Sequence, residues 1–389
     1  MIAAGRPRFH WFLPTGGDGR SLASGVHGLG IGGGPAGAGG TSGTGSTSGT
    51  GSTAGTAGTG GTAAARPASL AYLTQLAQAA DSLGYDAVLT PTGAHCADAW
   101  IVTAALIAAT KRLKFLVAFR PGLVAPALAA HMAATFQQLS EGRLLLNVVT
   151  GSSGAEQRGY GDRADHDVRY ARAEEFLQVV RQSWTGQQFD HHGTFYDLEG
   201  AQLRQPPAPT PEVYLGGSSD AALPVAARQA DCYLTWGEPP AMVADKIERV
   251  NELAAAEGRR MRFGLRVHVL SRDTEARAWA DAERLIAGLD DAAIAAGQRR
   301  LRALESVGQQ RMNTLHGGSR DGLVVAPNLW AGIGLVRGGA GTALVGSHDQ
   351  VAERIADYQA VGIEEFILSG YPHLEEAYAF AEGVRPLLR

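Results

Sequence analysis

An arginine and a histidine lie two residues apart in the apolar segment Phe263–Leu270. In an extended strand, residues two apart point to the same side, so Arg266 and His268 are predicted to share one face. A buried cation is costly unless it has a partner. That partner is either an anionic ligand or a structural carboxylate such as Glu238. We favour the ligand, which makes this segment a candidate anion-binding site.

A second arginine, Arg337, lies within a glycine-rich stretch, Gly334–Thr342, and is followed directly by Gly338 and Gly339. This composition is typical of a mobile lid with a charged tip. The alternative is an arginine on the solvated surface. The sequence alone supports the two interpretations equally.

The segment Gly216–Ser219 combines two glycines with two serines. Small residues let the backbone N–H groups at the start of a helix approach a phosphate, so Gly217, Ser218 and Ser219 are predicted to form a phosphate cradle. The alternative is a plain turn followed by a helix N-cap. The cradle is favoured because Thr150 offers a similar hydroxyl at the end of the adjacent predicted strand.

Further candidate residues are a tryptophan and a cysteine. Trp236 precedes the sequence Gly-Glu-Pro-Pro at a predicted strand end, and we interpret it as a pocket wall in preference to core. A lone cysteine such as Cys96 is more often a small buried hydrophobic residue than a reactive thiol. Neither Cys96 nor Cys232 has cysteine or histidine neighbours at metal-ligand spacing, so we expect reduced thiols and no metal site.

Eight short apolar runs, alternating with amphipathic segments, would position these residues. The predicted strands are Phe9–Leu13, Ala87–Thr90, Lys114–Phe119, Leu144–Val149, Glu212–Leu215, Cys232–Thr235, Phe263–Leu270 and Glu365–Leu368. This order predicts an α/β fold, a (β/α)8 TIM barrel, in which catalytic groups lie at the carboxyl ends of the strands. A doubly wound open sheet is the second choice, because no G-x-G-x-x-G motif follows the first strand.

Three long segments interrupt the alternation of strands and helices. Gly151–Asp167 and about Leu289–Gly346 are predicted to be insertion loops that build the active site at the carboxyl-terminal face. The third, Gly25–Ala65, consists almost entirely of Gly, Ser, Thr and Ala, and cannot bury enough apolar area to offset its ordering entropy. The sequence therefore predicts one domain, residues 1–389, with a disordered insert at about 25–65.

Composition limits the class of protein. Of 389 residues, 45% are hydrophobic, and the formal net charge is only −4, which argues against nucleic acid or an anionic membrane surface as the main partner. No window approaches the roughly 18 apolar residues of a membrane span, and no signal peptide is recognised, so we expect a cytoplasmic protein. The motifs of zinc proteases, P-loop enzymes and serine hydrolases do not occur.

The strand ends carry a family resemblance that spans nearly the whole chain outside the insert. The matching blocks are WFLPT (11–15), PTGAHCADAW (91–100), RLKFLVAFRP (112–121), GRLLLNVVTGS (142–152), YLGGSSD (214–220), DCYLTWGEPP (231–240), RFGLRVHV (262–269), SVGQQRM (306–312), NLWAGIGLVRGGAGTALVG (328–346) and LSGYPHLEEA (368–377). In these blocks the chain resembles the alkanesulfonate monooxygenases of the bacterial luciferase-like flavin superfamily. So many colinear blocks are more specific than any single motif.

The resemblance implies a two-component oxidoreductase. Reduced FMN (FMNH2) and O2 would convert an alkanesulfonate to an aldehyde and sulfite, leaving FMN and water, as part of sulfur acquisition. A separate NAD(P)H-dependent FMN reductase would supply the FMNH2, and the protein would form a homo-oligomer, a tetramer by resemblance. The flavin then carries the oxygen chemistry, and the protein supplies positioning, charge and exclusion of water.

The resemblance also assigns roles to residues. Cys96 would tune the flavin's reaction with oxygen, and Tyr371 would hydrogen-bond the oxygenated flavin or the substrate. The implied catalytic residues are Cys96, Arg266, His268, Arg337 and Tyr371. The implied substrate-binding residues are Trp236, Arg266, Arg337 and His373. The implied flavin-binding residues are Asn147, Thr150, Tyr170, Gly217, Ser218 and Ser219.

The chain departs from the family pattern at two places near the predicted active-site mouth. Gly16 replaces a histidine that usually follows Leu-Pro-Thr, and the insert replaces a short loop after the first strand. These changes leave two alternatives open. One is a luciferase-like relative that acts on another sulfonate or on an alkane, and the other is a flavin-binding barrel without activity.

Overall fold

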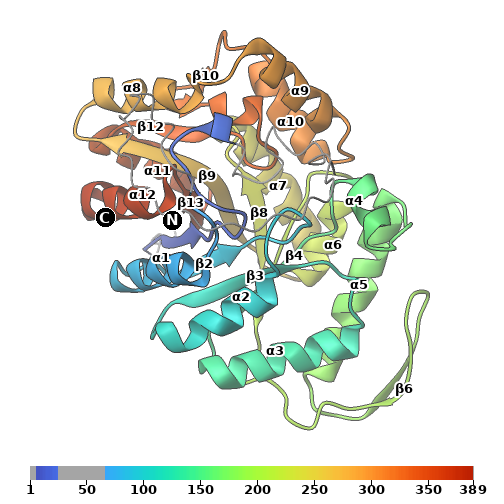
Figure 1. The fold of residues 1–389 in the computed structure, drawn as a ribbon. Helices are drawn as coiled ribbons and strands as arrows, with labels where there is room; N and C mark the ends of the chain where they lie inside the picture. The colour runs from blue at the N-terminus through green and yellow to red at the C-terminus, as the bar shows by residue number, and fades with distance from the viewer. Residues whose placement is uncertain (1–5, 25–65, 389) are drawn as a thin grey trace, which may run out of the picture.

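The computed structural model, which describes residues 6–24 and 66–388, contains a closed barrel of eight parallel strands (Figure 1). Its strands, in the order in which they pair, are β1 (Arg8–Phe12), β2 (Ala87–Thr90), β3 (Lys114–Phe119), β4 (Leu144–Val148), β7 (Glu212–Gly216), β8 (Cys232–Trp236), β9 (Arg262–Arg272) and β13 (Glu365–Ser369). β13 pairs with β1 and closes the ring. The TIM-barrel prediction is confirmed.

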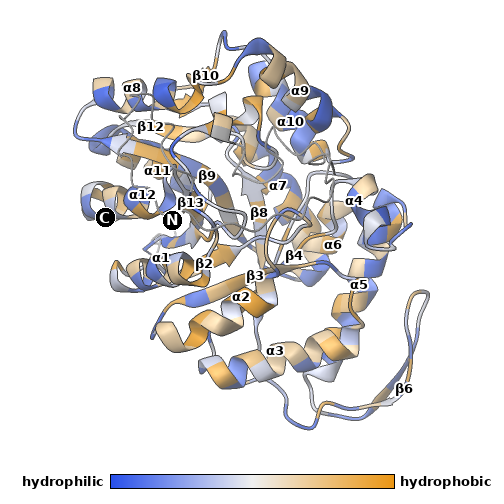
Figure 2. Ribbon diagram, viewed as in Figure 1, coloured by the Kyte–Doolittle hydropathy of each residue, from blue (hydrophilic) through white to orange (hydrophobic). Residues whose placement is uncertain are grey.

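All eight predicted strands are present, and their ends differ from the prediction by at most two residues. They could be found because strands covered on both faces read as nearly continuous apolar runs. β2, for example, is buried along its whole length. Figure 2 shows hydrophobic colouring along β2, β3 and β4 and on the helices that cover them.

Helices surround the barrel and cover the outer face of the strands (Figure 1). They are α1 (Leu70–Ser82), α2 (Ala99–Leu106), α3 (Pro126–Ser140), α5 (His166–Ser183), α6 (Ala222–Gln229), α7 (Pro240–Ala256), α11 (His348–Ala360) and α12 (His373–Ala379). Short helical turns add η1 (Leu22–Ser24), η2 (Ile107–Ala109), η4 (Phe380–Val384) and η5 (Arg385–Leu387). The largest hydrophobic cluster lies between these helices and the strands.

The two long insertions, predicted as loops, contain regular structure. The first holds α4 (Gly154–Gly159). The second belongs to an excursion that leaves β9 and holds α8 (Glu275–Ile286), α9 (Asp291–Arg302), α10 (Val307–His316), β10 (Val324–Ala326), β11 (Leu329–Trp330), η3 (Gly332–Leu335) and β12 (Ala343–Ser347). β12 then pairs in parallel with the last five residues of β9.

A hairpin of β5 (Phe189–His192) and β6 (Asp197–Ala201) was not predicted, and it extends away from the barrel at the lower right of Figure 1. The predicted insert at about 25–65 lies outside the described residues. The structure therefore confirms the barrel and gives no account of the insert.

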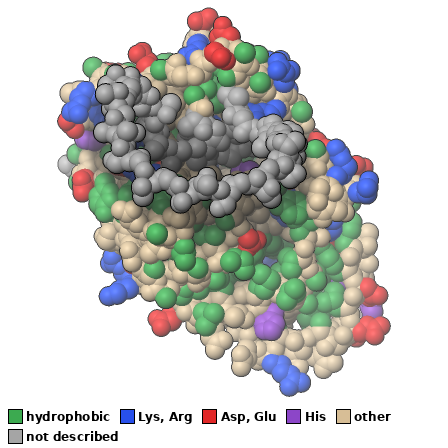
Figure 3. Space-filling model, viewed as in Figure 1, with side chains coloured by type: hydrophobic (Ala, Val, Ile, Leu, Met, Phe, Trp, Pro, Cys, Tyr) green, Lys and Arg blue, Asp and Glu red, His purple; other side chains and the backbone are tan. Residues whose placement is uncertain are grey.

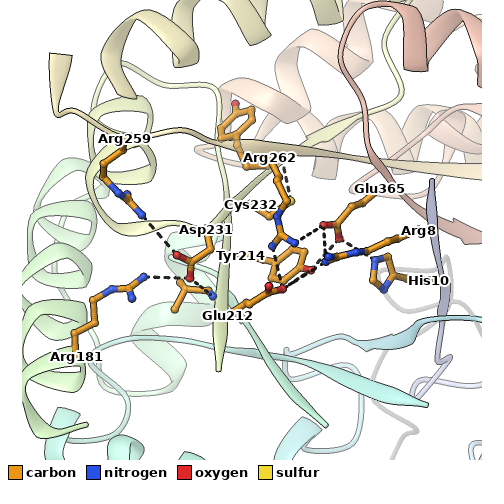
Figure 4. A network of polar contacts seen from close by, with 12 residues as sticks. Arg8, His10, Arg181, Glu212, Tyr214, Asp231, Cys232, Arg259, Arg262 and Glu365 are labelled. Atoms are coloured by element: carbon orange, nitrogen blue, oxygen red, sulfur yellow. Dashed lines mark hydrogen bonds and ion pairs between the residues drawn. The ribbon is translucent and has the colours of Figure 1, made fainter. Parts of the chain in front are cut away.

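An ion network closes the amino-terminal end of the barrel (Figure 4). At its centre, Glu365 is 1% exposed and contacts His10 Nε2 at 3.0 Å and the Tyr214 hydroxyl at 2.8 Å. Its other oxygen contacts the guanidinium groups of Arg262 at 3.2 Å and Arg8 at 3.3 Å. Although burial opposes it, the bonds from His10 and the charge of Arg262 lower the pKa of Glu365 to about 2. Charge at this end is paired.

Candidate active site

A cavity of about 370 Å³ opens at the carboxyl ends of the barrel strands. This volume lies in the range of roughly 300–1,000 Å³ that is typical of small-molecule sites. Its wall is formed by the ends of β1, β2, β4, β7, β8, β9 and β13, by α10, and by the loop 337–340. The cavity therefore lies at the face where the site was predicted, and polar residues from several strand ends meet in it.

Two arginine side chains meet at the ring of Phe12, inside this cavity. The guanidinium carbon of Arg266 lies 4.8 Å from the ring centroid, and that of Arg337 lies 5.9 Å from it. Arg266 donates only to backbone carbonyls, those of Val267 (3.1 Å) and Ile367 (3.4 Å). Within residues 6–24 and 66–388, neither arginine forms an ion pair with a carboxylate.

The two positive charges are therefore uncompensated. Burial, together with the charge of Arg337, lowers the pKa of Arg266 to about 9. The alternative of a structural pair between Arg266 and Glu238 is wrong, because Glu238 instead binds Lys246 at 2.8 Å and Arg311 at 3.1 Å. The geometry suits an anionic ligand that would bind both arginines.

Arg337 is half-buried, and its guanidinium also lies 5.4 Å from the Tyr371 ring. The backbone that follows Arg337 is held in place, because Gly339 N donates to the side-chain oxygen of Gln309 at 2.9 Å. The next carbonyl, that of Ala340, contacts His268 Nε2 at 3.0 Å. The interpretation of Arg337 as a solvated surface residue is therefore wrong, and this loop forms one wall of the cavity.

His268 is buried and uses both ring nitrogens. Nε2 contacts the carbonyl of Ala340, which can only accept, so Nε2 carries the proton. Nδ1 then accepts from the Ser369 hydroxyl at 2.6 Å. Burial, with the charges of Arg266 and Arg337, holds the pKa of His268 well below its usual value, so the ring is neutral. This arrangement suits a residue that orients the loop.

Tyr371 and His373 lie behind the cavity wall instead of lining it. The Tyr371 ring stacks on His268 with centroids 5.3 Å apart, and it meets the His373 ring edge-on at 5.1 Å. His373 Nδ1 contacts Asp18 at 2.8 Å. The structure thus brings both residues next to the arginines without exposing them in the cavity.

The predicted phosphate cradle lines the cavity at the end of β7, two strands from β9 in the ring. Gly217 has a φ of +145°, and a Cβ at this position would lie 2.6 Å from the Tyr170 hydroxyl. That hydroxyl is hydrogen-bonded to the side chains of Thr150 and Ser219. All six predicted flavin-binding residues line the cavity: Asn147, Thr150, Tyr170, Gly217, Ser218 and Ser219.

Trp236 lines the cavity as predicted, whereas Cys96 does not. The Trp236 ring lies against α10 at Gly308, where an added Cβ would be 3.3 Å from it. The Cys96 thiol is half-buried and is directed at the carbonyl of Gly93, 3.4 Å away. Burial raises the pKa of this thiol, so it is protonated at neutral pH.

The chain matches the family model described as "Luciferase-like monooxygenase" over residues 46–365. The chain belongs to the luciferase-like monooxygenase family. This assignment agrees with the barrel and with the position of the cavity, and it makes the protein an oxidoreductase of that family.

Solved structures of diverse proteins share the fold of this luciferase-like monooxygenase. A riboflavin lyase, solved with modified FMN and riboflavin, is 19% identical, with a TM-score of 0.75 over 98% of this chain and 91% of that one. The EDTA monooxygenase of Chelativorans sp. BNC1 is 20% identical, with a TM-score of 0.73 over 98% and 93% of the two chains.

An F420-dependent secondary alcohol dehydrogenase is 18% identical, with a TM-score of 0.64 over 82% and 95%. The three proteins thus include one solved with modified FMN and one that depends on F420. At such low identities the likeness establishes the fold, and the substrate has to be argued from the cavity itself.

Three cavity residues of this luciferase-like monooxygenase were missed in the sequence. His95 follows β2, and burial lowers its pKa. His166 begins α5, and Gln309 holds the Arg337 loop through Gly339. His95 carried a signal, since it directly precedes Cys96 in a matching block. Gln309 also lies in a matching block, SVGQQRM, but that block gave no sign of its contact with Gly339, which is 30 residues away in the chain.

No helix of the described residues combines the length and the apolar character that crossing a bilayer requires. Within the same residues, no cluster of three or more His, Cys, Asp or Glu side chains is arranged to hold a metal ion. The chemistry of the cavity is therefore argued from its arginines, imidazoles and hydroxyls.

Proposed function

We propose that this protein is an FMNH2-dependent alkanesulfonate monooxygenase, which converts an alkanesulfonate to an aldehyde and sulfite with O2 as the co-substrate. The observation that carries the proposal is the pair Arg266 and Arg337, which face one cavity with no carboxylate partner in the described residues. A sulfonate is a permanent anion with three oxygen acceptors. Two guanidinium forks can bind it with charge-assisted hydrogen bonds.

The part of the cavity at the end of β7 suits the phosphate of FMN. Gly217 lets the backbone approach a ligand where a Cβ would collide with Tyr170, and Ser218 and Ser219 add hydroxyl donors. We assign the phosphate to Tyr170, Ser218 and Ser219, and the flavin ring to the neighbourhood of Asn147 and Thr150. The bound reduced flavin supplies the oxygen chemistry.

The remaining residues would orient the substrate and exclude water. Arg337 and its loop cover the sulfonate, and His268 fixes this loop through the carbonyl of Ala340. Trp236 provides an apolar wall for the alkyl chain. Tyr371 contacts both the His268 ring and the guanidinium of Arg337, and so would fix their relative position.

The proposal extends to partners. A separate FMN reductase would reduce FMN with NAD(P)H, which places both proteins in the cytoplasm. Self-association is supported by an exposed apolar face on α2 and α3, where Ile101, Leu128 and Leu139 are 72%, 53% and 65% exposed. Figure 3 shows hydrophobic side chains gathered on the face where α2 and α3 lie. We propose that a second copy of the chain covers it.

The deciding experiment is sulfite release from a panel of alkanesulfonates, with FMNH2 generated in the assay and O2 present. Matched alkanes and alkanecarboxylates serve as controls, because they keep the chain length and change the head group. We expect sulfite from at least one sulfonate and no product from the matched alkane. Oxidation of the alkane, turnover with reduced F420 in place of FMNH2, or the absence of turnover with any substrate would contradict the proposal.

A further inference from the structure

Asp18 and His373 form a buried pair at the open end of the barrel, although they are 355 residues apart in the chain. Both side chains are 0% exposed. Asp18 Oδ1 contacts His373 Nδ1 at 2.8 Å, and Oδ2 accepts from the backbone N–H of His373 at 2.9 Å. The Tyr72 hydroxyl and Gly19 N also donate to this carboxylate. The imidazole is thus held at one nitrogen and at its own backbone.

The contacts decide which nitrogen carries the proton. Although burial opposes it, hydrogen bonds from the His373 ring, the His373 backbone and Tyr72 lower the pKa of Asp18 to about 2, so Asp18 is an acceptor at neutral pH. His373 Nδ1 must therefore donate. Burial lowers the pKa of His373, so the ring is neutral and Nε2 carries a lone pair. Nε2 is buried and has no hydrogen-bond partner in the described parts of the chain.

The ring lies next to the anion site. It meets Tyr371 edge-on at 5.1 Å and Phe12 at 5.7 Å, and Phe12 is the ring that Arg266 and Arg337 share. The titratable and charged groups around it are Asp18, Tyr371, His268, Arg266 and Arg337.

Of the two buried imidazoles that contact Tyr371, His268 uses both nitrogens and His373 uses one. Formation of an aldehyde removes one hydrogen from the carbon that carries the sulfonate, so the site needs a proton acceptor. A buried acceptor without a partner is costly to maintain, which is the kind of cost found at functional sites.

We propose that Asp18 is a positioning residue that fixes His373 as the Nδ1–H tautomer and so reserves Nε2 as the proton acceptor of the sulfonate site. The inference rests on the proposed desulfonation. As the substrate carbon gains one oxygen atom of O2 and becomes the aldehyde carbon, the proton that it releases reaches Nε2 through one water, and the electron pair of the broken carbon–sulfur bond leaves with sulfite. The second oxygen atom of O2 leaves as water. FMNH2 and O2 are the reductant and the oxidant of the overall reaction. Asp18 stabilises the imidazolium until its proton returns to solvent with product release.

The other end of the barrel offers a matched control. His10 and Glu365 form a second buried imidazole–carboxylate pair, with Nε2 of His10 and Oε2 of Glu365 3.0 Å apart. This pair lies in the amino-terminal ion network, away from the cavity. Asp18→Asn and Glu365→Gln therefore make the same chemical change in two similar pairs, of which only one adjoins the site.

The first test compares steady-state kinetics across pH. Asp18→Asn should lower kcat about 10- to 100-fold, as expected for loss of a group that orients a catalytic imidazole, with little change in KM for the sulfonate. The acid limb of the kcat profile should move to lower pH, because the imidazolium loses its carboxylate. Glu365→Gln should lower the melting temperature and leave kcat and its pH limb unchanged. In a His373→Gln background, Asp18→Asn should cause no further loss.

A second readout is independent of turnover. In ¹⁵N-histidine NMR spectra, with His373 assigned by its loss in His373→Gln, the wild-type ring should carry its proton on Nδ1, and Asp18→Asn should change this state. A wild-type ring protonated on Nε2, an unchanged tautomer in Asp18→Asn, or full additivity of Asp18→Asn and His373→Gln would overturn the inference. An Nδ1–H tautomer that depends on Asp18, in a protein that desulfonates no substrate, would overturn the proposed function and its acceptor role but support the positioning.

Discussion

Both ends of the barrel carry a pair of arginines, but the arginines are paired with a carboxylate at one end and not at the other. At the amino-terminal end, Arg8 and Arg262 contact the carboxylate of Glu365 at 3.3 and 3.2 Å, and the network is complete without a ligand. At the carboxyl-terminal end, Arg266 and Arg337 face an aromatic ring and each other's charge. The difference shows where charge stabilises the fold and where it is kept available for an anion.

The contrast has an energetic basis. A buried ion that has lost its partner destabilises a protein by about 3–5 kcal/mol, so an unpaired buried cation is tolerated only where something else compensates it. For Arg266 the compensation within the described residues comes from two carbonyls and the face of Phe12. Full compensation comes with an anionic substrate. Substitutions at the amino-terminal end should therefore lower stability, and substitutions at the carboxyl-terminal end should lower activity.

The largest effect is expected at the paired end. Glu365→Gln removes the carboxylate that holds Arg262 and His10, and should lower the free energy of unfolding by about 3–5 kcal/mol in chemical denaturation. Arg8→Ala is the control, because its side chain is 44% exposed and exposed pairs contribute about 0–1 kcal/mol. Equal losses in the two variants would remove the distinction between a buried network and a surface pair.

Arg266→Met should show the opposite pattern. Removing a fork that makes two charge-assisted bonds to the sulfonate should lower kcat/KM about a hundredfold or more. The melting temperature should stay the same or rise, because a desolvated cation beside Arg337 is removed. Arg266→Lys should recover part of the activity. A large fall in melting temperature with activity retained would mean that Arg266 stabilises the fold and does not bind the substrate.

Arg337→Ala should have a smaller effect on the same reaction. Loss of one charge-assisted contact is worth about 1.5–3 kcal/mol, or about 10- to 100-fold in kcat/KM, while the barrel stays folded. Opening of the loop should also admit water, so that more hydrogen peroxide and less sulfite form per O2 consumed. Arg337→Lys serves as the comparison variant. A sulfite-to-peroxide ratio unchanged in Arg337→Ala would leave Arg266 as the sole sulfonate anchor.

The pH dependence of stability separates the buried imidazoles from the buried carboxylates. The pKa of His268 is well below 6.5 in the folded protein, so the unfolded chain binds a proton first, and stability should fall by about 1.4 kcal/mol per pH unit below roughly pH 6.5. The pKa of Glu365 is lowered from 4.5 to about 2, so its contribution is present above pH 4.5 and is lost as the pH falls towards 2.

Denaturation curves between pH 7 and pH 3 measure both steps. His268→Gln should flatten the step between pH 5 and 6.5, and Glu365→Gln should flatten the step below pH 4.5. His373 adds to the first step and Asp18 to the second, because their pKa values are shifted in the same directions. Loss of the first step in Glu365→Gln would contradict this assignment of the steps to imidazoles and carboxylates.

The sequence predicted the barrel well because its strands are covered on both faces and need apolar residues throughout, as in β3. The hairpin β5–β6 was missed because its burial alternates weakly and its residues, such as Asp190 and Gly200, are typical of turns. β12 was missed because its pairing partner, the end of β9, is fixed only in three dimensions.

The site could be predicted in part. Arg266, His268 and the Gly217–Ser219 segment could be identified because they end strands, and strand ends meet at one face of a barrel. The position of Arg337 over Phe12 could not be predicted, and neither could the pair of Asp18 with His373, because each contact joins segments hundreds of residues apart. Spacing along the chain carries no signal for such contacts.

The excursion that leaves β9 and returns through β12 has a further consequence for how this enzyme can change. Both of its ends are fixed to one strand, since β9 ends at Arg272 and β12 pairs with His268–Arg272 of the same strand. Ring closure of the barrel depends on β8, β9, β13 and β1 and on no strand inside the excursion. Residues 273–342, which carry Arg337 and Gln309, therefore form an exchangeable cassette. Replacing it would reshape one wall of the cavity and leave Arg266 on its strand, so new substrates can be acquired without rebuilding the scaffold.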